Sequence, residues 1–198
     1  MKKLLLTLLC LPMIFSCGEK KKEKKLIQSY EDKENNIFLV VGNTHQGGII
    51  FYLDGNGGGL IAAPTDQSTE AEWGCEGILI SGADQTAIGT GAQNTIDIEN
   101  GCTTPGTAAD ICANLTLDGY SDWFLPSQDE LNLMYKIDKM YKLKGIGNNP
   151  IWSGDFGDNY YWSSTEYDKS EAWLQNLWSG RPTHNKSDKE HVRAVRAF

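Results

Sequence analysis

Apolar residues change their spacing along this chain, and each spacing predicts a different element. An almost unbroken apolar run covers residues 4–15. Further on, residues 49–53 and 60–63 are short apolar runs on either side of a glycine-rich stretch, which predicts a β-hairpin. A similar run at residues 37–41 predicts one more strand ahead of the hairpin.

A helical period appears twice in the middle of the chain. Residues 107–117 carry one apolar stripe, and residues 128–142 are predicted to form a second helix that begins after a capping box made by Ser127 and Glu130. The stripe of the first helix occupies positions i, i+3, i+4 and i+7, which are Ala108, Ile111, Cys112 and Leu115.

Strand-like runs return at residues 160–164, 171–178 and 191–198, and they predict a three-stranded antiparallel meander. Residues 181–190 are predicted to be a polar excursion before the last strand. Residues 64–106 are polar, glycine-rich and without a clear period, so a long loop is predicted there, of a kind that is often functional. Because strands and helices occupy separate stretches, the predicted fold class is α+β.

The N-terminal run has the form of a targeting segment. Lys2 and Lys3 precede it, and about 12 apolar positions are too few to cross a membrane. The run ends in Ser16 and Cys17, which resembles the processing site of bacterial lipoproteins, where the cysteine receives the lipid. Residues 1–17 are therefore predicted to be a lipoprotein signal peptide with Cys17 lipidated. A secreted protein without a lipid is the alternative.

A charged stretch follows the cysteine. Residues 18–36 are predicted to be a solvated tether, with a basic patch on anionic lipid headgroups as the alternative, and residues 37–198 the folded domain. Residues 34–198 contain 10 Lys and Arg against 22 Asp and Glu, a net charge of −12. This balance argues against nucleic acid and polyanionic partners. The expected location is the bacterial cell envelope, with the lipid in the outer membrane.

Three cysteines remain beyond the signal peptide, in an oxidising exported context. They allow one disulfide in any of three pairings. Cys112 lies on the apolar stripe of a predicted helix and is expected to be a buried thiol. Cys75 and Cys102 both flank glycine-rich loops, which favours a disulfide between these two.

No metal or cofactor is predicted. The chain has no Cys-x-x-Cys pair, and its three histidines are scattered. Asp54 and the glycines after it imitate the start of a calcium loop, but Thr65 occupies the twelfth position, where a bidentate glutamate is needed. The run from Gly89 is not a dinucleotide fingerprint either, since Asn94 replaces the third glycine and no helix is signalled just after it.

Five ordered motifs resemble the Lcl C-terminal domain family, which is named for the C-terminal domain of Legionella collagen-like adhesins. The resemblance extends from Gly47 to Phe198. Its motifs are residues 47–52 (GGIIFY), 89–95 (GTGAQNT), 119–127 (GYSDWFLPS) with Glu130 and Leu131, 161–166 (YWSSTE) and 192–196 (VRAVR).

The resemblance implies a fold similar to C-type lectins, with two helices, an antiparallel hairpin-rich sheet and long ligand-binding loops. It also implies adhesion through sulfated glycans at the cell surface. Two features of this chain depart from that pattern. No collagen-like repeat precedes the domain, and its acidic charge suits a sulfated ligand only where Arg181, His184 and Lys186 form a local basic patch. The calcium-binding triplets of C-type lectins are absent.

Aromatic and polar residues near the predicted C-terminal strands are the candidates for ligand binding. Aromatic faces stack on sugar rings, and neighbouring carboxylates or amides bind hydroxyls. Core packing is the alternative for each ring, and it is the expectation for Trp73, Trp123, Trp162 and Trp173. The candidate ligand-binding residues are Trp152, Asp155, Asp158, Asn159, Tyr160, Trp178, Arg181 and His184.

Three functions follow from these observations. The leading hypothesis is a binding module without catalysis that recognises a glycan or another extracellular ligand. A structural or assembly component that binds an envelope protein is the second. An enzyme is the third, because Asp155 with Asp158 or Glu166 imitates a glycosidase pair, although the common nucleophile and metalloprotease motifs are absent.

Overall fold

The computed structural model describes residues 29–32, 37–143, 159–176 and 182–198. Within these ranges the chain forms three helices and eleven strands. They are β1 (Ser29–Asp32), β2 (Ile37–Val40), β3 (Thr44–His45), β4 (Gly48–Leu53), β5 (Gly59–Ala62), β6 (Ser68–Glu72), α2 (Gly91–Gly101), α3 (Ala108–Ala113), α4 (Gln128–Leu143), β7 (Tyr160–Glu166), β8 (Glu171–Asn176), β9 (Thr183–Asn185), β10 (Lys189–Val192) and β11 (Val195–Ala197).

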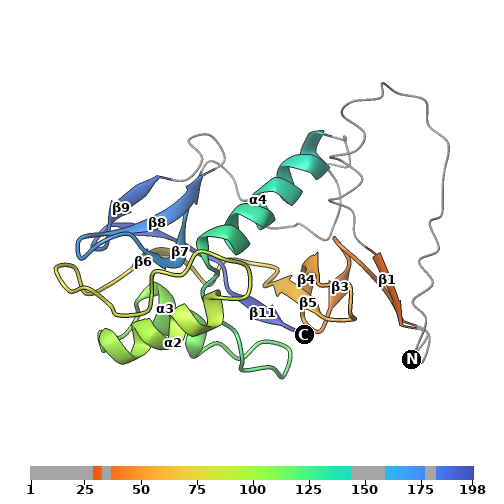
Figure 1. Ribbon diagram of the computed structural model, residues 1–198, viewed down its shortest axis with the longest axis horizontal. Helices are drawn as coiled ribbons and strands as arrows, with labels where there is room; N and C mark the ends of the chain where they lie inside the picture. The colour runs from red at the N-terminus through yellow and green to blue at the C-terminus, as the bar shows by residue number, and fades with distance from the viewer. Residues whose placement is uncertain (1–28, 33–36, 144–158, 177–181) are drawn as a thin grey trace.

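The strands form two larger sheets and one small one, which confirms the α+β class. The five-stranded sheet has the order β6-β10-β7-β8-β9, and the four-stranded sheet has the order β11-β5-β4-β3. Figure 1 shows α2 and α3 beneath the five-stranded sheet, with β3, β4 and β5 towards the opposite end of the molecule. None of the helices in the described part of the chain is long and apolar enough to cross a membrane.

The predicted hairpin is β4 and β5, which pair in antiparallel fashion. Its turn is held by Asp54, whose Oδ1 accepts hydrogen bonds from the backbone N–H of Asn56 at 2.7 Å and of Gly58 at 3.1 Å. A Cβ at Gly59 would collide with the carbonyl oxygen of Tyr52, so the strand needs glycine there. The acidic start of this loop therefore serves the turn.

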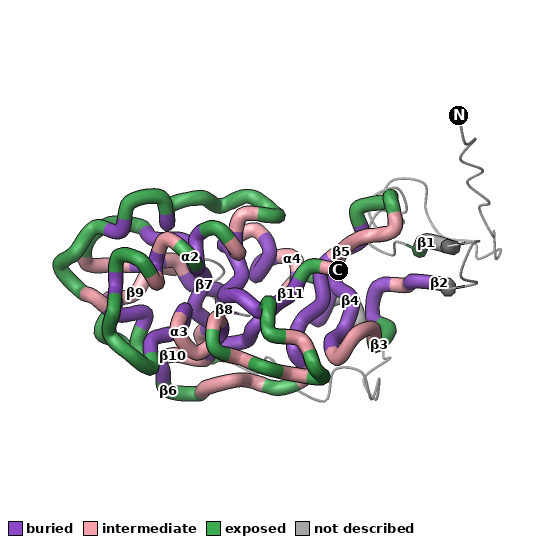
Figure 2. Tube along the Cα trace, turned by 90° about the horizontal axis from the view of Figure 1, so that it is seen from below, coloured by how far each residue is buried: buried purple, intermediate pink, exposed green. Residues whose placement is uncertain are grey.

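The hydrophobic core lies between the sheets and the helices, along the purple segments of Figure 2. Trp73, Trp123 and Trp162 are buried, as expected. The indole N–H of Trp73 donates to the carbonyl of Ser163 at 2.9 Å. The expectation for Trp173 is wrong, because its side chain is only half-buried. Its neighbours along β8 take the inward positions, and alternation turns Trp173 outward.

Helix α2 corrects the expectation that no helix follows the run from Gly89. The helix begins at Gly91, although glycine is a poor helix former. Glycine is needed there because a Cβ would collide with the carboxylate of Glu130. Helix α3 is shorter than predicted and ends at Ala113, with its N-cap Thr107 accepting from the N–H of Asp110 at 3.4 Å. Leu115 therefore lies beyond the helix.

Three segments expected to lack regular structure contain strands. β1 lies within the predicted tether and pairs with β2. β6 lies within the predicted long loop, and β9 within the predicted polar excursion. All three strands are short and polar, so their own composition gives little signal, and pairing with a neighbouring strand stabilises them.

The predicted C-terminal meander is correct only for its first two strands. β7, β8 and β9 pair in antiparallel order, but residues 191–198 divide between the two sheets. β10 pairs with β6 and β7, whereas β11 pairs with β5. The crossing at Ala194 is held by its N–H, which donates to Oε1 of Gln67 at 2.6 Å, and by its carbonyl, which accepts from Ala63 at 2.9 Å.

The predicted capping box at the start of α4 is present, and its glutamate also binds a second segment of the chain. Ser127 N–H donates to Oε2 of Glu130 at 2.7 Å, and Gly89 N–H donates to Oε1 at 2.7 Å. Burial raises the pKa of Glu130, while these backbone donors act in the opposite direction. Glu130 therefore joins the start of α4 to the segment that leads into α2.

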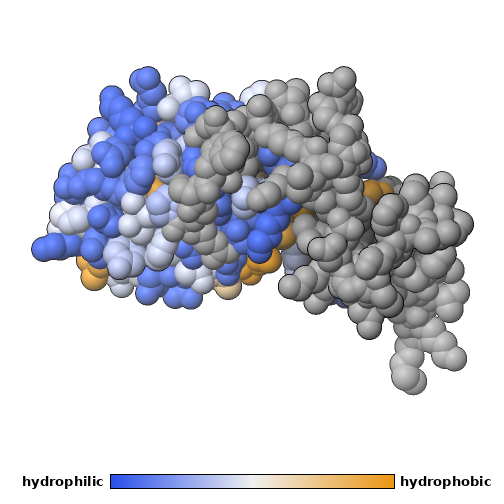
Figure 3. Space-filling view, turned by 90° about the horizontal axis from the view of Figure 1, so that it is seen from above, coloured by the Kyte–Doolittle hydropathy of each residue, from blue (hydrophilic) through white to orange (hydrophobic). Residues whose placement is uncertain are grey.

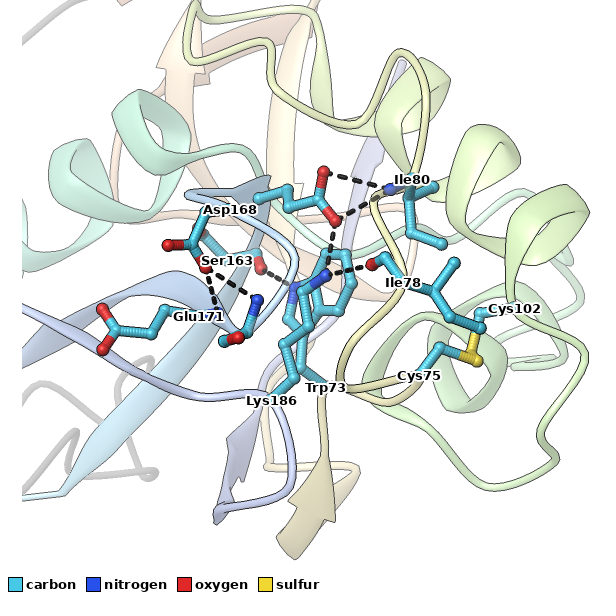
Figure 4. A network of polar contacts seen from close by, with 11 residues as sticks. Trp73, Cys75, Ile78, Ile80, Cys102, Ser163, Asp168, Glu171 and Lys186 are labelled. Carbon is cyan, nitrogen blue, oxygen red and sulfur yellow. Dashed lines mark hydrogen bonds and ion pairs between the residues drawn. A yellow bond between two sulfur atoms is a disulfide. The ribbon is translucent and has the colours of Figure 1, made fainter.

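A buried ion pair between Lys186 and Glu166 fastens the segment after β6 to the five-stranded sheet (Figure 4). The ammonium of Lys186 also donates to the carbonyl of Ile78 at 2.9 Å and lies 4.6 Å from the ring centroid of Trp73. The carboxylate of Glu166 accepts from the N–H of Ile80 at 2.9 Å. The ammonium and the carboxylate are thus each bound by uncharged groups as well as by one another.

The same segment is fastened at its start by a disulfide between Cys75 and Cys102, the pairing favoured from the sequence. Cys112 is a buried free thiol, also as expected. Burial in an apolar environment raises its pKa, so the reactive thiolate is disfavoured in the folded chain.

We expect Lys186→Met to lower the free energy of unfolding by about 3–5 kcal/mol, because the variant leaves the buried carboxylate of Glu166 without its counter-charge. Urea unfolding followed by circular dichroism measures the loss. Lys169→Met, which removes an exposed lysine, should change the stability by no more than about 0.5 kcal/mol. Equal stability of Lys186→Met and the parent chain would contradict the role of the ion pair.

Thiol titration should give a stepwise count when applied to the chain from residue 18 onward, which retains three cysteines. The folded chain should show no reactive thiol, since Cys112 is buried. Unfolding in urea should expose one thiol, and reduction before unfolding should expose three. One reactive thiol in the folded chain, or three without reduction, would be incompatible with this arrangement.

Candidate functional site

Two of the predicted ligand-binding residues come together at one end of the five-stranded sheet. Tyr160 begins β7, and His184 lies in β9. Their ring centroids are 4.6 Å apart, and the rings are tilted by 44°. In the strand registers Tyr160 pairs with Asn176 and His184 pairs with Ala172, two positions on the same face of β8.

Glu190 fixes the imidazole of His184. Its Oε1 lies 2.7 Å from Nδ1 of His184, and the side chains are 28% and 15% exposed, respectively. A carboxylate at Nδ1 favours the tautomer with the proton on that nitrogen. Among the described residues the hydrogen bond of the His184 ring is made by Nδ1, and Nε2 is the ring nitrogen that can accept one.

Asn159 precedes Tyr160 in the chain and is exposed. Its backbone carbonyl oxygen accepts a hydrogen bond from Nδ2 of Asn176 at 3.2 Å. The candidate site therefore consists of Asn159, Tyr160, His184 and Glu190. The remaining predicted ligand-binding residues, namely Trp152, Asp155, Asp158, Trp178 and Arg181, lie outside the described residues.

The basic patch expected of Arg181, His184 and Lys186 does not include Lys186. Its side chain is 0% exposed and pairs with Glu166, so it presents no charge at the surface. The same pairing removes Glu166 from the glycosidase-like pairs considered above, because a buried carboxylate bound to an ammonium does not reach a substrate in solvent. His184 itself is paired with Glu190.

A second cluster of the same residue types lies on the other face of β7. Oδ2 of Asp66 lies 3.0 Å from the hydroxyl of Tyr161 and 2.9 Å from Nδ1 of His191. Its Oδ1 accepts from Nε of Arg193 at 2.6 Å. Burial raises the pKa of Tyr161. With both oxygens of Asp66 occupied, this cluster serves to hold residues 63–67 against the sheet.

The sequence gives no sign of the Asp66 cluster or of Glu190, because their partners are brought together only by strand pairing. The other described arginine, Arg196, pairs with Asp122 and lies 3.8 Å from the ring centroid of Tyr120. Among the described residues no group of three His, Cys, Asp or Glu is placed to hold a metal ion. The arrangement at Tyr160 offers an aromatic face, a hydrogen-bond acceptor and a carboxylate.

The comparison with protein families gives one match. The family described as the Lcl C-terminal domain matches residues 63–196, so the motif at residues 47–52 lies ahead of the matched range. The fold of this family is C-type-lectin-like, in agreement with the α+β architecture. The comparison with curated proteins finds no match to this chain. The family match covers the whole five-stranded sheet, all three helices and the candidate site, and the chain belongs to the Lcl C-terminal domain family.

Proposed function

We propose that this protein is a binding module of the bacterial cell envelope that recognises a glycan or another extracellular ligand and carries out no catalysis. Its family is associated with adhesins, which supports a binding role. The observation that carries the proposal is the half-exposed ring of Tyr160 beside His184, whose orientation is fixed by Glu190.

This arrangement suits a sugar for two physical reasons. The apolar face of Tyr160 offers a stacking surface to the C–H groups of a pyranose ring. Nε2 of His184 accepts a hydrogen bond from a hydroxyl, and Glu190 holds the imidazole in place before the ligand arrives. Because the polar groups are already oriented, binding loses less conformational entropy than it would with mobile side chains.

We also propose a lipid on Cys17 as the attachment to the outer membrane. In this proposal the signal peptide is cut before Cys17, which becomes the lipidated N-terminus, residues 18–36 connect the lipid to the folded part, and residues 37–198 form the domain. An extended chain gains about 3.5 Å per residue, so residues 18–28 reach at most about 40 Å. That length holds the domain near the membrane while the ligand-binding end of the five-stranded sheet remains accessible.

A structural or assembly role is the second candidate, and two exposed residues favour it. The side chains of Ile78 and Leu79 are 52% and 69% exposed, although the backbone around them is pinned by Lys186 and Glu166. The coloured part of the surface in Figure 3 is mainly hydrophilic, so exposed apolar side chains stand out from their surroundings. An apolar pair held rigidly at the surface is typical of a contact with another protein.

A glycan array probed with the chain from residue 18 onward tests the binding function, with and without calcium. We expect Tyr160→Ala and His184→Ala each to weaken binding at least tenfold, which corresponds to about 1.4 kcal/mol. His45→Ala, which changes a half-exposed histidine of the other sheet, is the matched control and should bind as the parent chain does.

Two outcomes would contradict the proposal. Unchanged binding by both site variants would place the ligand elsewhere on the domain. An empty array, together with one envelope protein that is captured by the parent chain and lost with Leu79→Ser, would favour the assembly role.

Cys17→Ala tests the anchor in the full-length chain. The variant should incorporate no labelled fatty acid and should leave the membrane fraction, because the thiol is the acceptor of the lipid. Cys10→Ala is the matched control and should remain lipidated. Labelled lipid on the Cys17→Ala protein would show that the processing site lies elsewhere.

A further inference from the structure

The outward face of β8 and β9 carries an aromatic residue in a polar setting. Ala172 and Leu174 point into the core, so the residues that alternate with them, Glu171 and Trp173, lie on the opposite face and are half-buried. In the register with β9, Trp173 pairs with Thr183. His184 and Tyr160 belong to the inward set, so this outward face is distinct from the candidate site.

Tyr167 completes an aromatic corner on this face. Its ring stands edge-on to that of Trp173, with centroids 5.1 Å apart and an angle of 86° between the planes. The side chain of Tyr167 is 57% exposed. Tyr167 therefore packs against Trp173 with one edge and presents most of its surface to solvent.

The turn that carries Tyr167 is held by its own hydrogen bonds. Oδ1 of Asp168 accepts from the N–H of Ser170 at 2.7 Å and from that of Glu171 at 2.8 Å. The N–H of Tyr167 donates to the carbonyl of Glu171 at 3.0 Å. Because the turn is fixed in this way, the two rings keep their geometry without a ligand, which lowers the entropic cost of binding.

Polar groups suited to hydroxyls surround the corner. Oε2 of Glu171 accepts from the hydroxyl of Thr183 at 2.5 Å, and Figure 4 shows this carboxylate pointing away from Lys186 and Trp73. No hydrogen-bond acceptor in the described part of the chain contacts the indole N–H of Trp173. A donor and an acceptor therefore flank the rings, as in sugar-binding sites.

The charges beside the corner favour an uncharged ligand. Glu171 and Asp168 are adjacent to it in the strand and the turn, and Asn185, the register partner of Glu171, donates to Glu76 at 2.9 Å. Lys169 is the one cation in the turn. Three carboxylates against one ammonium would repel sulfated or carboxylated sugars.

We propose that Trp173 and Tyr167 form a second ligand site, on the outward face of β8 and β9, which binds a pyranose ring of an uncharged oligosaccharide. The ring stacks on the exposed aromatic surface, and its hydroxyls bind the carboxylate of Glu171 and the indole N–H of Trp173. The inference rests on the proposed binding function, but it names a different face and a narrower ligand class.

The test is a titration of the chain from residue 18 onward with chitotriose, cellotriose and maltotriose, and with heparin as the sulfated comparison. Calorimetry gives the affinity, and the indole N–H signal of Trp173, assigned with Trp173→Phe, reports contact. We expect at least one neutral trisaccharide to bind, to shift that signal, and to bind at least tenfold more weakly to Tyr167→Ala. Glu171→Gln should weaken binding severalfold.

Tyr160→Ala and Ile96→Ala are the controls, the first for the candidate site and the second for loss of a remote exposed side chain. Both should bind the trisaccharide as the parent chain does. Urea unfolding shows whether each variant keeps its fold, and Tyr167→Ala should, because most of its side chain is already exposed.

Four results would contradict the second site, its ligand class or the binding function. Trisaccharide binding that survives Tyr167→Ala and is lost with Tyr160→Ala leaves the binding function in place and overturns the second site. Heparin binding that depends on Tyr167 overturns the uncharged class. No trisaccharide binding, with another ligand found on the glycan array, also overturns the second site alone. No ligand in any of these measurements overturns the site and the proposed function together.

Discussion

The arrangement of this domain depends on a charge pair that is almost completely removed from water. Burying an ammonium and a carboxylate costs several kcal/mol for each ion, and their mutual attraction offsets this only when other hydrogen bonds complete both groups. Lys186 and Glu166 meet this condition through Ile78, Ile80 and Trp73. The pair joins the segment after β6, the end of β7 and the turn after β9, which are distant in the chain, so it determines which loop lies against which strand.

With that loop fastened, the two faces of β7, β8 and β9 acquire different environments. One face packs on the core and opens only at its end, where the Tyr160 ring meets His184. The other face is buried at Tyr161 and Gln175 and reaches the surface at Trp173, which is half-buried. Strand alternation alone assigns residues to these faces, so neighbours in the sequence such as Tyr160 and Tyr161 belong to different clusters, each with a histidine and a carboxylate.

Sequence patterns predicted the parts of this fold whose residues and turns carry their own signal in the sequence. The β4–β5 hairpin, the capping box of α4 and the pairing of Cys75 with Cys102 were all accessible from the sequence. Helix α2 was not, because Gly91 is required by a contact with Glu130, 39 residues later in the chain. For the same reason the candidate site was only partly predicted: Tyr160 and His184 have recognisable chemistry, whereas Glu190 gains its role from a partner in another strand.

The crossing at Ala194 has a consequence for how the chain reaches its folded state. β10 lies between β6 and β7 in one sheet, and β11 closes the other sheet against β5, so both sheets are incomplete until residues 189–197 are present. A chain that emerges from its N-terminus onward would therefore hold unpaired strand edges until almost the whole domain has appeared. Pairings between residues so far apart in the chain form slowly, so the two sheets of such a domain are completed in one late step of folding.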